Sequence, residues 1–322
     1  MRLVVALGVV AGCVAPVVPG DTGAAVVETG GVGSDGCDDA WAGNLTIGST
    51  DDMAAFCGAY RSVTGSLEVS GLADSVDLTG LSCLCDVGAE LRVLHSPGLG
   101  SLAGLDGLTH VGRSLILGDN LALTDLTGLG GLVDTGGLLL TNTAITSVAG
   151  LTQLTAINGA LGVYEEPNLV SFDGFPMLDA APWNLAVKRS DRFASLEGLD
   201  WIDSLETLEL EELPQLTSLR GLDGLTEVTL APDGAARALQ LTALGIVDVD
   251  GLAGLRRVGN GLYLRNNPDL VDLSALHGVA SIDGALVIEG NASLTTAEAW
   301  ALVDAIGEEN IAGGVFVGGN GG

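Results

Sequence analysis

Few side chains in this sequence could carry out catalysis, and only one group of them combines acid and base. Lys188 and Arg189 belong to the one basic cluster of an acidic chain, and Glu209 and Glu211 follow about twenty residues later. A polysaccharide-cleaving enzyme would need such groups to converge on one face, with paired carboxylates at a defined separation. No His, Ser or Cys nucleophile accompanies them. We therefore predict no catalytic residue, and we interpret the cluster as local ion pairs with Glu165, Glu166, Glu211 and Glu212.

The histidines and cysteines do not have metal-binding spacing. His95, His110 and His277 are far apart, and the Cys83-Leu84-Cys85 segment lacks the nearby His or Cys ligands of a zinc site. The Asp and Glu residues are scattered and form no Asp-x-Asp-x-Asp-Gly calcium loop. The sequence therefore predicts neither a metal nor a cofactor.

The N-terminus has the pattern of an export signal. Met1-Arg2 precedes an apolar run at 3–12 that is too short to span a bilayer. The run ends in Val10-Ala11-Gly12-Cys13, which resembles the bacterial lipobox. This resemblance implies that residues 1–12 are removed and that acyl chains on Cys13 hold the protein on a membrane. A simple cleaved signal peptide, with no role for Cys13, is the alternative.

Residues 13–36 predict a flexible tether between this anchor and a folded domain at 37–322. They are rich in Pro, Gly, Thr and Asp and have no periodic apolar pattern. Val14 follows the modified Cys, which for enteric bacteria is compatible with the outer membrane or cell surface. The membrane leaflet stays open.

Four cysteines remain beyond Cys13, which in an exported chain favours two disulfides. Three connectivities are possible for Cys37, Cys57, Cys83 and Cys85. We prefer Cys37–Cys57, which ties the end of the tether to the first helix. That choice leaves an unusual bridge between Cys83 and Cys85, so a bond from Cys37 or Cys57 to either of them stays open.

The folded part is a repeat of about 24 residues built on Leu-x-(Val/Leu/Ile). Successive first leucines, from Leu67 to Leu286, lie 24, 24, 23, 23, 24, 23, 31, 23 and 24 residues apart. Within each unit leucines recur every third residue, as at Leu123, Leu126 and Leu129. Period three fits neither a helix nor a long strand, but it suits short strands joined by turns. Each coil cannot bury its leucines alone, so stacked coils are predicted.

The repeat is similar to the receptor L-domain type of leucine-rich repeat. The unit is seen best as LYLRNNPDLVDLSALHGVASIDG at 262–284, and the resemblance covers about residues 37–318. It implies a mainly β, right-handed, single-stranded β-solenoid of about 11 coils with short capping helices at both ends. It also implies a function in binding or adhesion and not catalysis.

Both ends carry signals for these caps. The N-terminal cap spans about 37–63, where Ser49-Thr50-Asp51-Asp52 opens a short helix to Tyr60. The C-terminal cap spans about 295–318, where Thr295 and Glu298 form a capping box and Gly307 ends the helix. A last strand at 314–318 closes the stack. This cap has no cysteine, so we expect packing alone to hold it.

The middle residue of each predicted strand faces outward, and so does the residue two positions later. Ile116 and Leu139 then form an apolar patch beside Tyr164 and Lys188, and exposed apolar area can mark a contact site. The candidate ligand-binding residues are Ile116, Leu139, Tyr164, Lys188, Glu209, Tyr263 and Arg265. Single exposed Leu and Ile residues are nevertheless normal on protein surfaces.

Composition limits the partners further. The chain has a net charge of −29, and Lys188 is its single lysine, which argues against nucleic acid as a partner. We expect a cell-envelope lipoprotein, attached through Cys13, whose solenoid binds an unidentified protein or glycan. The alternatives are a parallel β-helix enzyme that degrades polysaccharide and a purely structural envelope protein. Oligomeric state stays open.

Overall fold

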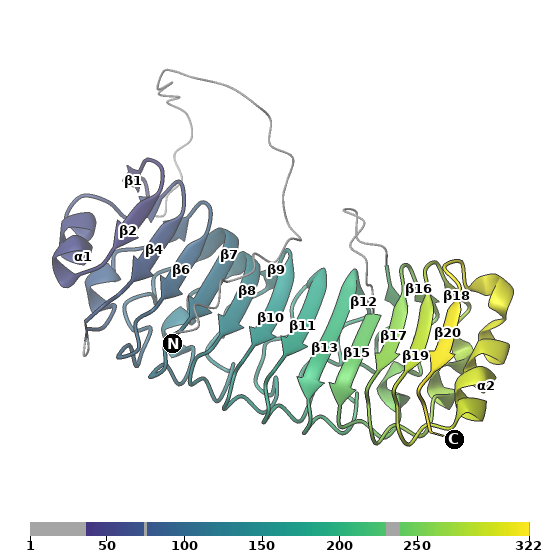
Figure 1. The fold of residues 1–322 in the computed structure, drawn as a ribbon. Coiled ribbons are helices and arrows are strands. Elements are labelled where there is room, and N and C mark those ends of the chain that lie inside the picture. The colour runs from purple at the N-terminus through teal and green to yellow at the C-terminus, as the bar shows by residue number, and fades with distance from the viewer. Residues whose placement is uncertain (1–36, 74–75, 230–238, 322) are drawn as a thin grey trace.

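Parallel strands stack into a long solenoid. The computed structural model describes residues 37–73, 76–229 and 239–321. The strands form a β-solenoid of about 10 turns, with one α-helix at each end (Figure 1). The predicted mainly β solenoid with capping helices is therefore confirmed.

One parallel ladder runs the length of the molecule. Its strands are β2 (Leu45–Ile47), β4 (Leu67–Ser70), β6 (Leu91–Leu94), β7 (His110–Gly118), β8 (Asp134–Thr141), β10 (Ala160–Tyr164), β11 (Asn184–Lys188), β13 (Thr207–Leu213), β15 (Leu239–Leu244), β17 (Leu262–Arg265), β19 (Leu286–Glu289) and β20 (Val315–Gly318). The register pairs the first leucine of one repeat with that of the next, as for Leu91 and Leu115. Residues about 24 apart in the sequence are therefore neighbours in space.

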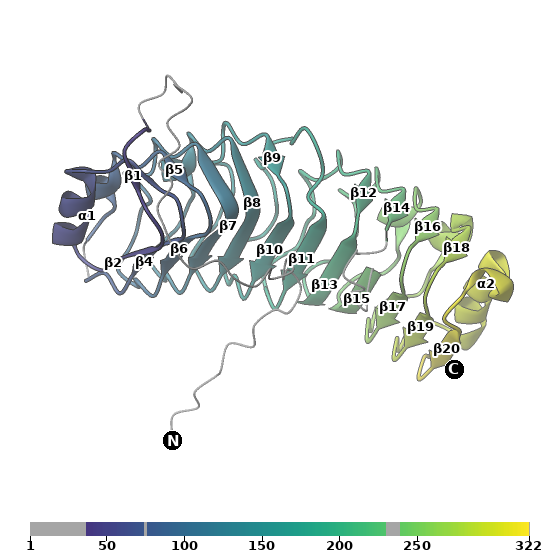
Figure 2. The same cartoon turned by 90° about the horizontal axis from the view of Figure 1, so that it is seen from above.

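A second, interrupted ladder of two-residue strands lies on another side of the coils (Figure 2). Its first part contains β1 (Ala40–Trp41), β3 (Ser62–Val63), β5 (Asp86–Val87) and β9 (Ala156–Ile157), which join the main sheet through β7 and β8. Its second part is a separate four-stranded sheet of β12 (Ser204–Leu205), β14 (Glu227–Val228), β16 (Arg257–Val258) and β18 (Ser281–Ile282). The strands β7 and β8 are long enough to belong to both ladders. The sequence predicted one strand per coil, and this second ladder is an addition to it.

The leucines with period three fill the interior. Leu123, Leu126, Leu129 and Leu132 each have 0% exposed surface. One side chain from each segment of the coil points inward, and coils stack at the strand spacing of about 4.8 Å. The core is therefore a narrow column of aliphatic side chains.

Two kinds of polar turn separate these leucines. Where the turn begins with Asp, the carboxylate accepts the backbone N–H two residues on, as from Thr127 to Asp125 (3.0 Å). These turns form the 3₁₀ helices η1 (Thr79–Leu81), η2 (Thr127–Leu129), η3 (Asp250–Leu252) and η4 (Ser274–Gly278). Where the turn begins with Ser, as at Ser101, the hydroxyl makes the same bond. Most of these coils then use a left-handed glycine, such as Gly104 at φ 108°.

A buried polar position follows most of the main strands and links neighbouring coils, whereas the same position is Leu72, Leu213 and Leu244 in three coils. Asn267 Oδ1 accepts the N–H of Leu244 (2.9 Å), and its Nδ2 donates to the carbonyl of Leu241 (3.1 Å). Asn291 repeats both bonds one coil later. These side chains satisfy backbone groups that the turn leaves unpaired inside the protein.

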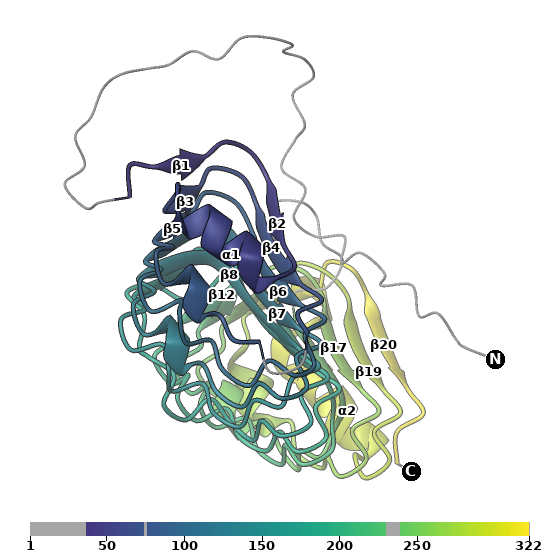
Figure 3. The same cartoon turned by 90° about the vertical axis from the view of Figure 1, so that its left-hand side faces the viewer.

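Both ends are closed by helices at the predicted positions. The helix α1 (Thr50–Cys57) has Ser49 as its N-cap, and it lies across the end of the coils in Figure 3. The helix α2 (Thr296–Ile306) is capped by Thr295, which accepts from the N–H of Glu298 (3.1 Å), and it ends at Gly307. A last short 3₁₀ helix, η5 (Glu308–Asn310), leads into β20.

Candidate functional site

The outer face of the main ladder carries all seven candidate residues. Side chains alternate along a strand, so that Leu115 and Leu117 are fully buried while Ile116 between them is half-buried. The middle outward row contains Ile116, Leu139, Glu209 and Tyr263, and the row two residues on contains Tyr164, Lys188 and Arg265. The structure therefore places these residues on one face, as expected, although not at one point.

The apolar half of this face is continuous. Ile116 pairs in register with Leu139, and Leu139 pairs with Gly162. The ring of Tyr164 crosses Gly162, because a Cβ there would lie 2.5 Å from Tyr164 Cε2 and 2.7 Å from Leu139 Cδ2. Only glycine leaves room for that ring on the sheet.

We call the outward residues of these strands, apart from Lys188 at the end of β11, the uncharged block. It contains Ser114, Ile116, Gly118, Gly137, Leu139, Thr141, Ala160, Gly162, Tyr164, Asn184 and Ala186, from β7, β8, β10 and β11. None of these side chains is charged at neutral pH. Burial raises the pKa of Tyr164, and the neighbouring Glu209 raises it further. The block is therefore a neutral surface on a chain of net charge −29.

A small ionic cluster borders the block. Lys188 pairs in register with Tyr164 and Glu211, and its side chain is 20% exposed. Its Nζ contacts the Glu209 carboxylate and lies 3.6 Å from Glu211 Oε2. The geometry fits the ion-pair interpretation of the basic cluster, since the only lysine is held by two carboxylates.

For the other residues of the predicted ion-pair cluster, the structure agrees with the prediction at Glu165 and differs from it at Glu166. Arg189 Nη2 lies 2.9 Å from Glu165 Oε1 at the corner of the coil, as expected. Glu166 does not join the cluster, because it occupies the buried polar position after β10 and has no exposed surface. Its carboxylate accepts from the Thr143 N–H (3.1 Å) and bonds the Thr143 hydroxyl (2.8 Å). Burial raises the pKa of Glu166 to about 7.

Tyr263 and Arg265 form a separate group. The Arg265 guanidinium lies 4.9 Å from the centre of the Tyr263 ring, and its Nε lies 3.7 Å from Glu289 Oε2. The strands β13 and β15 separate this group from Lys188. The candidates therefore make two groups on one face.

Between the two groups, on β15, the buried Thr242 hydroxyl has no hydrogen-bond partner among the described residues.

The preferred disulfide pairing is wrong. The bridges are Cys37–Cys85 and Cys57–Cys83, with Cα–Cα distances of 6.1 and 5.6 Å. Cys83 lies in the turn after η1, while Cys85 lies directly before β5, so the two residues are not on one regular strand and face different partners. Cys85 precedes β5, in the ladder that begins with β1 just after Cys37, and Cys83 lies near the end of α1. This outcome is among the connectivities that stayed open.

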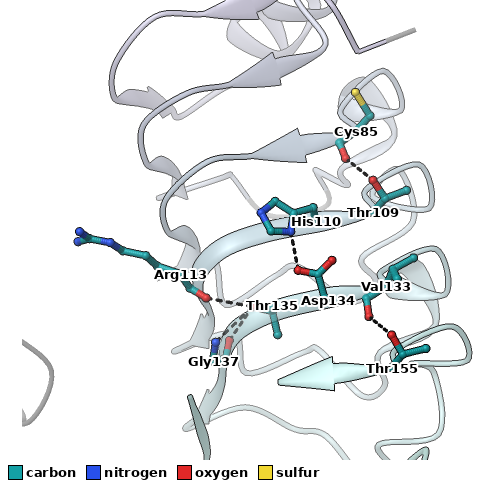
Figure 4. Close-up of polar contacts among 9 residues, drawn as sticks. All are labelled: Cys85, Thr109, His110, Arg113, Val133, Asp134, Thr135, Gly137 and Thr155. Atoms are coloured by element: carbon teal, nitrogen blue, oxygen red, sulfur yellow. Dashed lines mark hydrogen bonds and ion pairs between the residues drawn. The ribbon is translucent and has the colours of Figure 1, made fainter. Parts of the chain in front are cut away.

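Sequence reasoning missed a cluster on the second ladder. His110 Nδ1 lies 2.6 Å from Asp134 Oδ1 (Figure 4). Asp86 is the register partner of His110 on its other side. Burial raises the pKa of Asp86. The three residues are each 24 positions apart, so the repeat length itself was the signal that could have found them. Within the described residues, no three His, Cys, Asp or Glu side chains are placed to hold a metal.

The same view explains why the repeat from Leu115 to Leu138 has 23 residues, one fewer than 24. The register between β7 and β8 shifts between Val111 and Ser114, so β7 bulges at Gly112 and Arg113. The hydroxyl of Thr135 donates toward the carbonyls of Arg113 (3.1 Å) and Gly137 (2.9 Å), as Figure 4 shows. Thr135 therefore satisfies backbone carbonyls at the bulge. The extra residue in β7 accounts for the spacing of 23 residues between Leu115 and Leu138.

The anchor predicted at the N-terminus lies outside the described residues. This applies to the leader at 1–12, to lipidation of Cys13 and to the tether at 13–36. Neither of the two α-helices in the described residues is long and apolar enough to cross a membrane.

Comparison with known proteins gave no relative. No family model, no curated protein and no solved structure matches the chain.

Proposed function

We propose that this protein is a non-enzymatic binding module, anchored to the cell envelope by lipid on Cys13, and that its outward sheet face holds a protein or a glycan. The observation that carries the proposal is the one-sided main ladder. Its inner side chains form the core, while its outer side chains form a continuous surface from β2 to β20 that the core does not use. The lipobox and the receptor L-domain pattern support it from the sequence.

The anchor is tested by metabolic labelling with radioactive palmitate in a bacterium that processes lipoproteins. We expect the full chain to incorporate label and to fractionate with the envelope. The Cys13→Ser variant is expected to lose the label. Equal labelling of both proteins would contradict the lipobox interpretation.

The binding face is tested on arrays of glycans and of envelope proteins, using the purified full chain. We expect a ligand whose binding weakens in Lys188→Ala, since this removes a cation from the centre of the face. Met177→Ala is the matched control, because Met177 is 76% exposed and lies outside the main ladder. A ligand that responds to neither substitution would place binding elsewhere.

A second candidate function rests on the contact of Lys188 with Glu209 and Glu211. An amine between two carboxylates is a possible acid–base group for cleaving polysaccharide. Incubation with a polysaccharide panel, followed by an assay for reducing ends, separates the two candidates. Turnover that is abolished by Lys188→Ala would replace the binding function with an enzymatic one.

A further inference from the structure

The uncharged block is a neutral surface between two ion-paired borders. On one side Arg92 contacts Glu90, and on the other Lys188 contacts Glu209. The cation at each border is therefore already paired within the protein, Lys188 with a second carboxylate, that of Glu211. An uncharged, partly apolar area of this kind on a strongly acidic protein is suited to a ligand without charge.

The glycines of the block do not open hollows in its surface. Three of its positions are glycines, and side chains of the block and of neighbouring strands lie over them. A Cβ at Gly118 would lie 3.0 Å from Leu94 Cδ2 and from Thr141 Cγ2, and Gly162 is crossed by Tyr164. Two surface cavities, of about 280 and 180 Å³, lie at the Pro214–Pro268 corner and beside Trp41. Neither cavity is lined by the block, and side chains cover its glycines, which favours an extended ligand over a small molecule that needs enclosure.

The size of the block argues against a protein partner. Four strands and three outward rows cover roughly 20 Å by 20 Å, or about 400 Å². A stable protein interface needs about 800 Å² on each partner. Beyond the borders the surface becomes ionic, so the neutral area cannot be extended to that size. A narrow, extended ligand fits the available area better.

We infer that the block binds a neutral polysaccharide chain that lies across the strands β7 to β11. This inference rests on the proposed function and gives its ligand class. The ring of the half-buried Tyr164 lies over Gly162 and would pack against the C–H groups of a sugar, while Ile116 and Leu139 supply further apolar contact. Thr141 and Asn184 add a hydroxyl and an amide at the edges of the block for the hydroxyl groups of the sugar.

Isothermal titration of the purified full chain tests the inference. The probes are cellohexaose, laminarihexaose, chitohexaose and mannohexaose, with hexagalacturonate as a charged comparison. Leu139→Asp introduces a charge at the centre of the block. Phe316→Asp is its matched control, because Phe316 occupies the same outward row on β20 and is 51% exposed. Circular dichroism verifies that both variants fold.

We expect at least one neutral hexasaccharide to bind, with an affinity that salt leaves unchanged. Leu139→Asp and Tyr164→Ala should each weaken it about tenfold or more, while Phe316→Asp should not. No binding of any neutral probe at roughly 1 mM, or equal binding by Leu139→Asp and the parent, would overturn the inference. The proposed function fails separately, if neither glycan nor protein arrays yield a ligand sensitive to any substitution on the outward face.

Discussion

Glu166 is a carboxyl group that folding removes entirely from water. It occupies a position where most other coils have Ser, Thr or Asn and three have Leu, and it bonds Thr143 one coil away. Burial raises its pKa to about 7 from an ordinary value of 4.5. The folded state therefore holds this proton more tightly than the unfolded chain does. The contribution of Glu166 to the free energy of unfolding should be largest below pH 4.5 and should be lost as the pH rises through about 7.

Replacing Glu166 with Gln should remove this pH dependence. An amide has the same shape and can still accept from the Thr143 N–H, but it cannot ionise. We expect Glu166→Gln to raise the free energy of unfolding at pH 8 by up to about 3 kcal/mol and to leave it nearly unchanged at pH 4. Urea unfolding across this pH range measures the effect.

The exposed neighbour Glu165 provides the control for this experiment. Glu165→Gln loses only a surface ion pair with Arg189, so its effect should stay within about 1 kcal/mol and show no transition near pH 7. If Glu166→Gln is no more stable than the parent at pH 8, ionisation of the buried carboxyl does not destabilise the folded state, and the prediction is wrong.

At the scale of the element, the Asp turns define where the coils that contain η1 to η4 bend. Asp125 Oδ1 accepts from the N–H of Thr127 (3.0 Å) and from its hydroxyl (2.6 Å), and η2 begins there. These hydrogen bonds, first from the Thr127 hydroxyl and then from its N–H, lower the pKa of Asp125. The turn is therefore held by an ionised carboxylate at neutral pH.

Asp125→Ala should cost about 1 kcal/mol, because the N–H of Thr127 loses its partner. Asp125→Asn keeps an acceptor at the same place and should cost less. Thermal unfolding of the two variants, measured side by side, distinguishes loss of the turn from loss of the charge. Equal destabilisation by Ala and Asn would mean that the charge, and not the turn geometry, is what matters.

For the whole molecule, the two disulfides hold only one end. Both bridges lie in the first coils, and the described residues of the C-terminal cap contain no cysteine. A solenoid coil contacts only its neighbours, so the effect of a bridge should remain local. Cross-links across 48 and 26 residues are each expected to contribute about 3–4 kcal/mol through the entropy of the unfolded chain.

Reduction with dithiothreitol should therefore loosen α1 and β1 to β6 first. Hydrogen exchange is expected to show lost protection in those elements, while amides of β13 to β20 keep theirs and act as an internal control. Uniform loss of protection along the chain would show that the solenoid unfolds as one unit.

The sequence by itself determined the repeat, the inward leucines, both caps and the face that carries the candidate residues. These features depend on local periodicity and on cap residues, such as Ser49 and Thr295, which act within a few positions of the chain. Only the tertiary structure decided the cysteine pairs. Cys37 and α1 precede the regular repeat, so the repeat length does not predict which residues lie next to them.

The tertiary structure also decided which outward residues touch. The Tyr164 ring over Gly162, the burial of Glu166 and the contact of His110 with Asp134 all arise between coils. Within one coil, periodicity sets only whether a side chain points inward or outward. How coils stack sets its neighbours, and a shift of one residue, as at the β7 bulge, changes them.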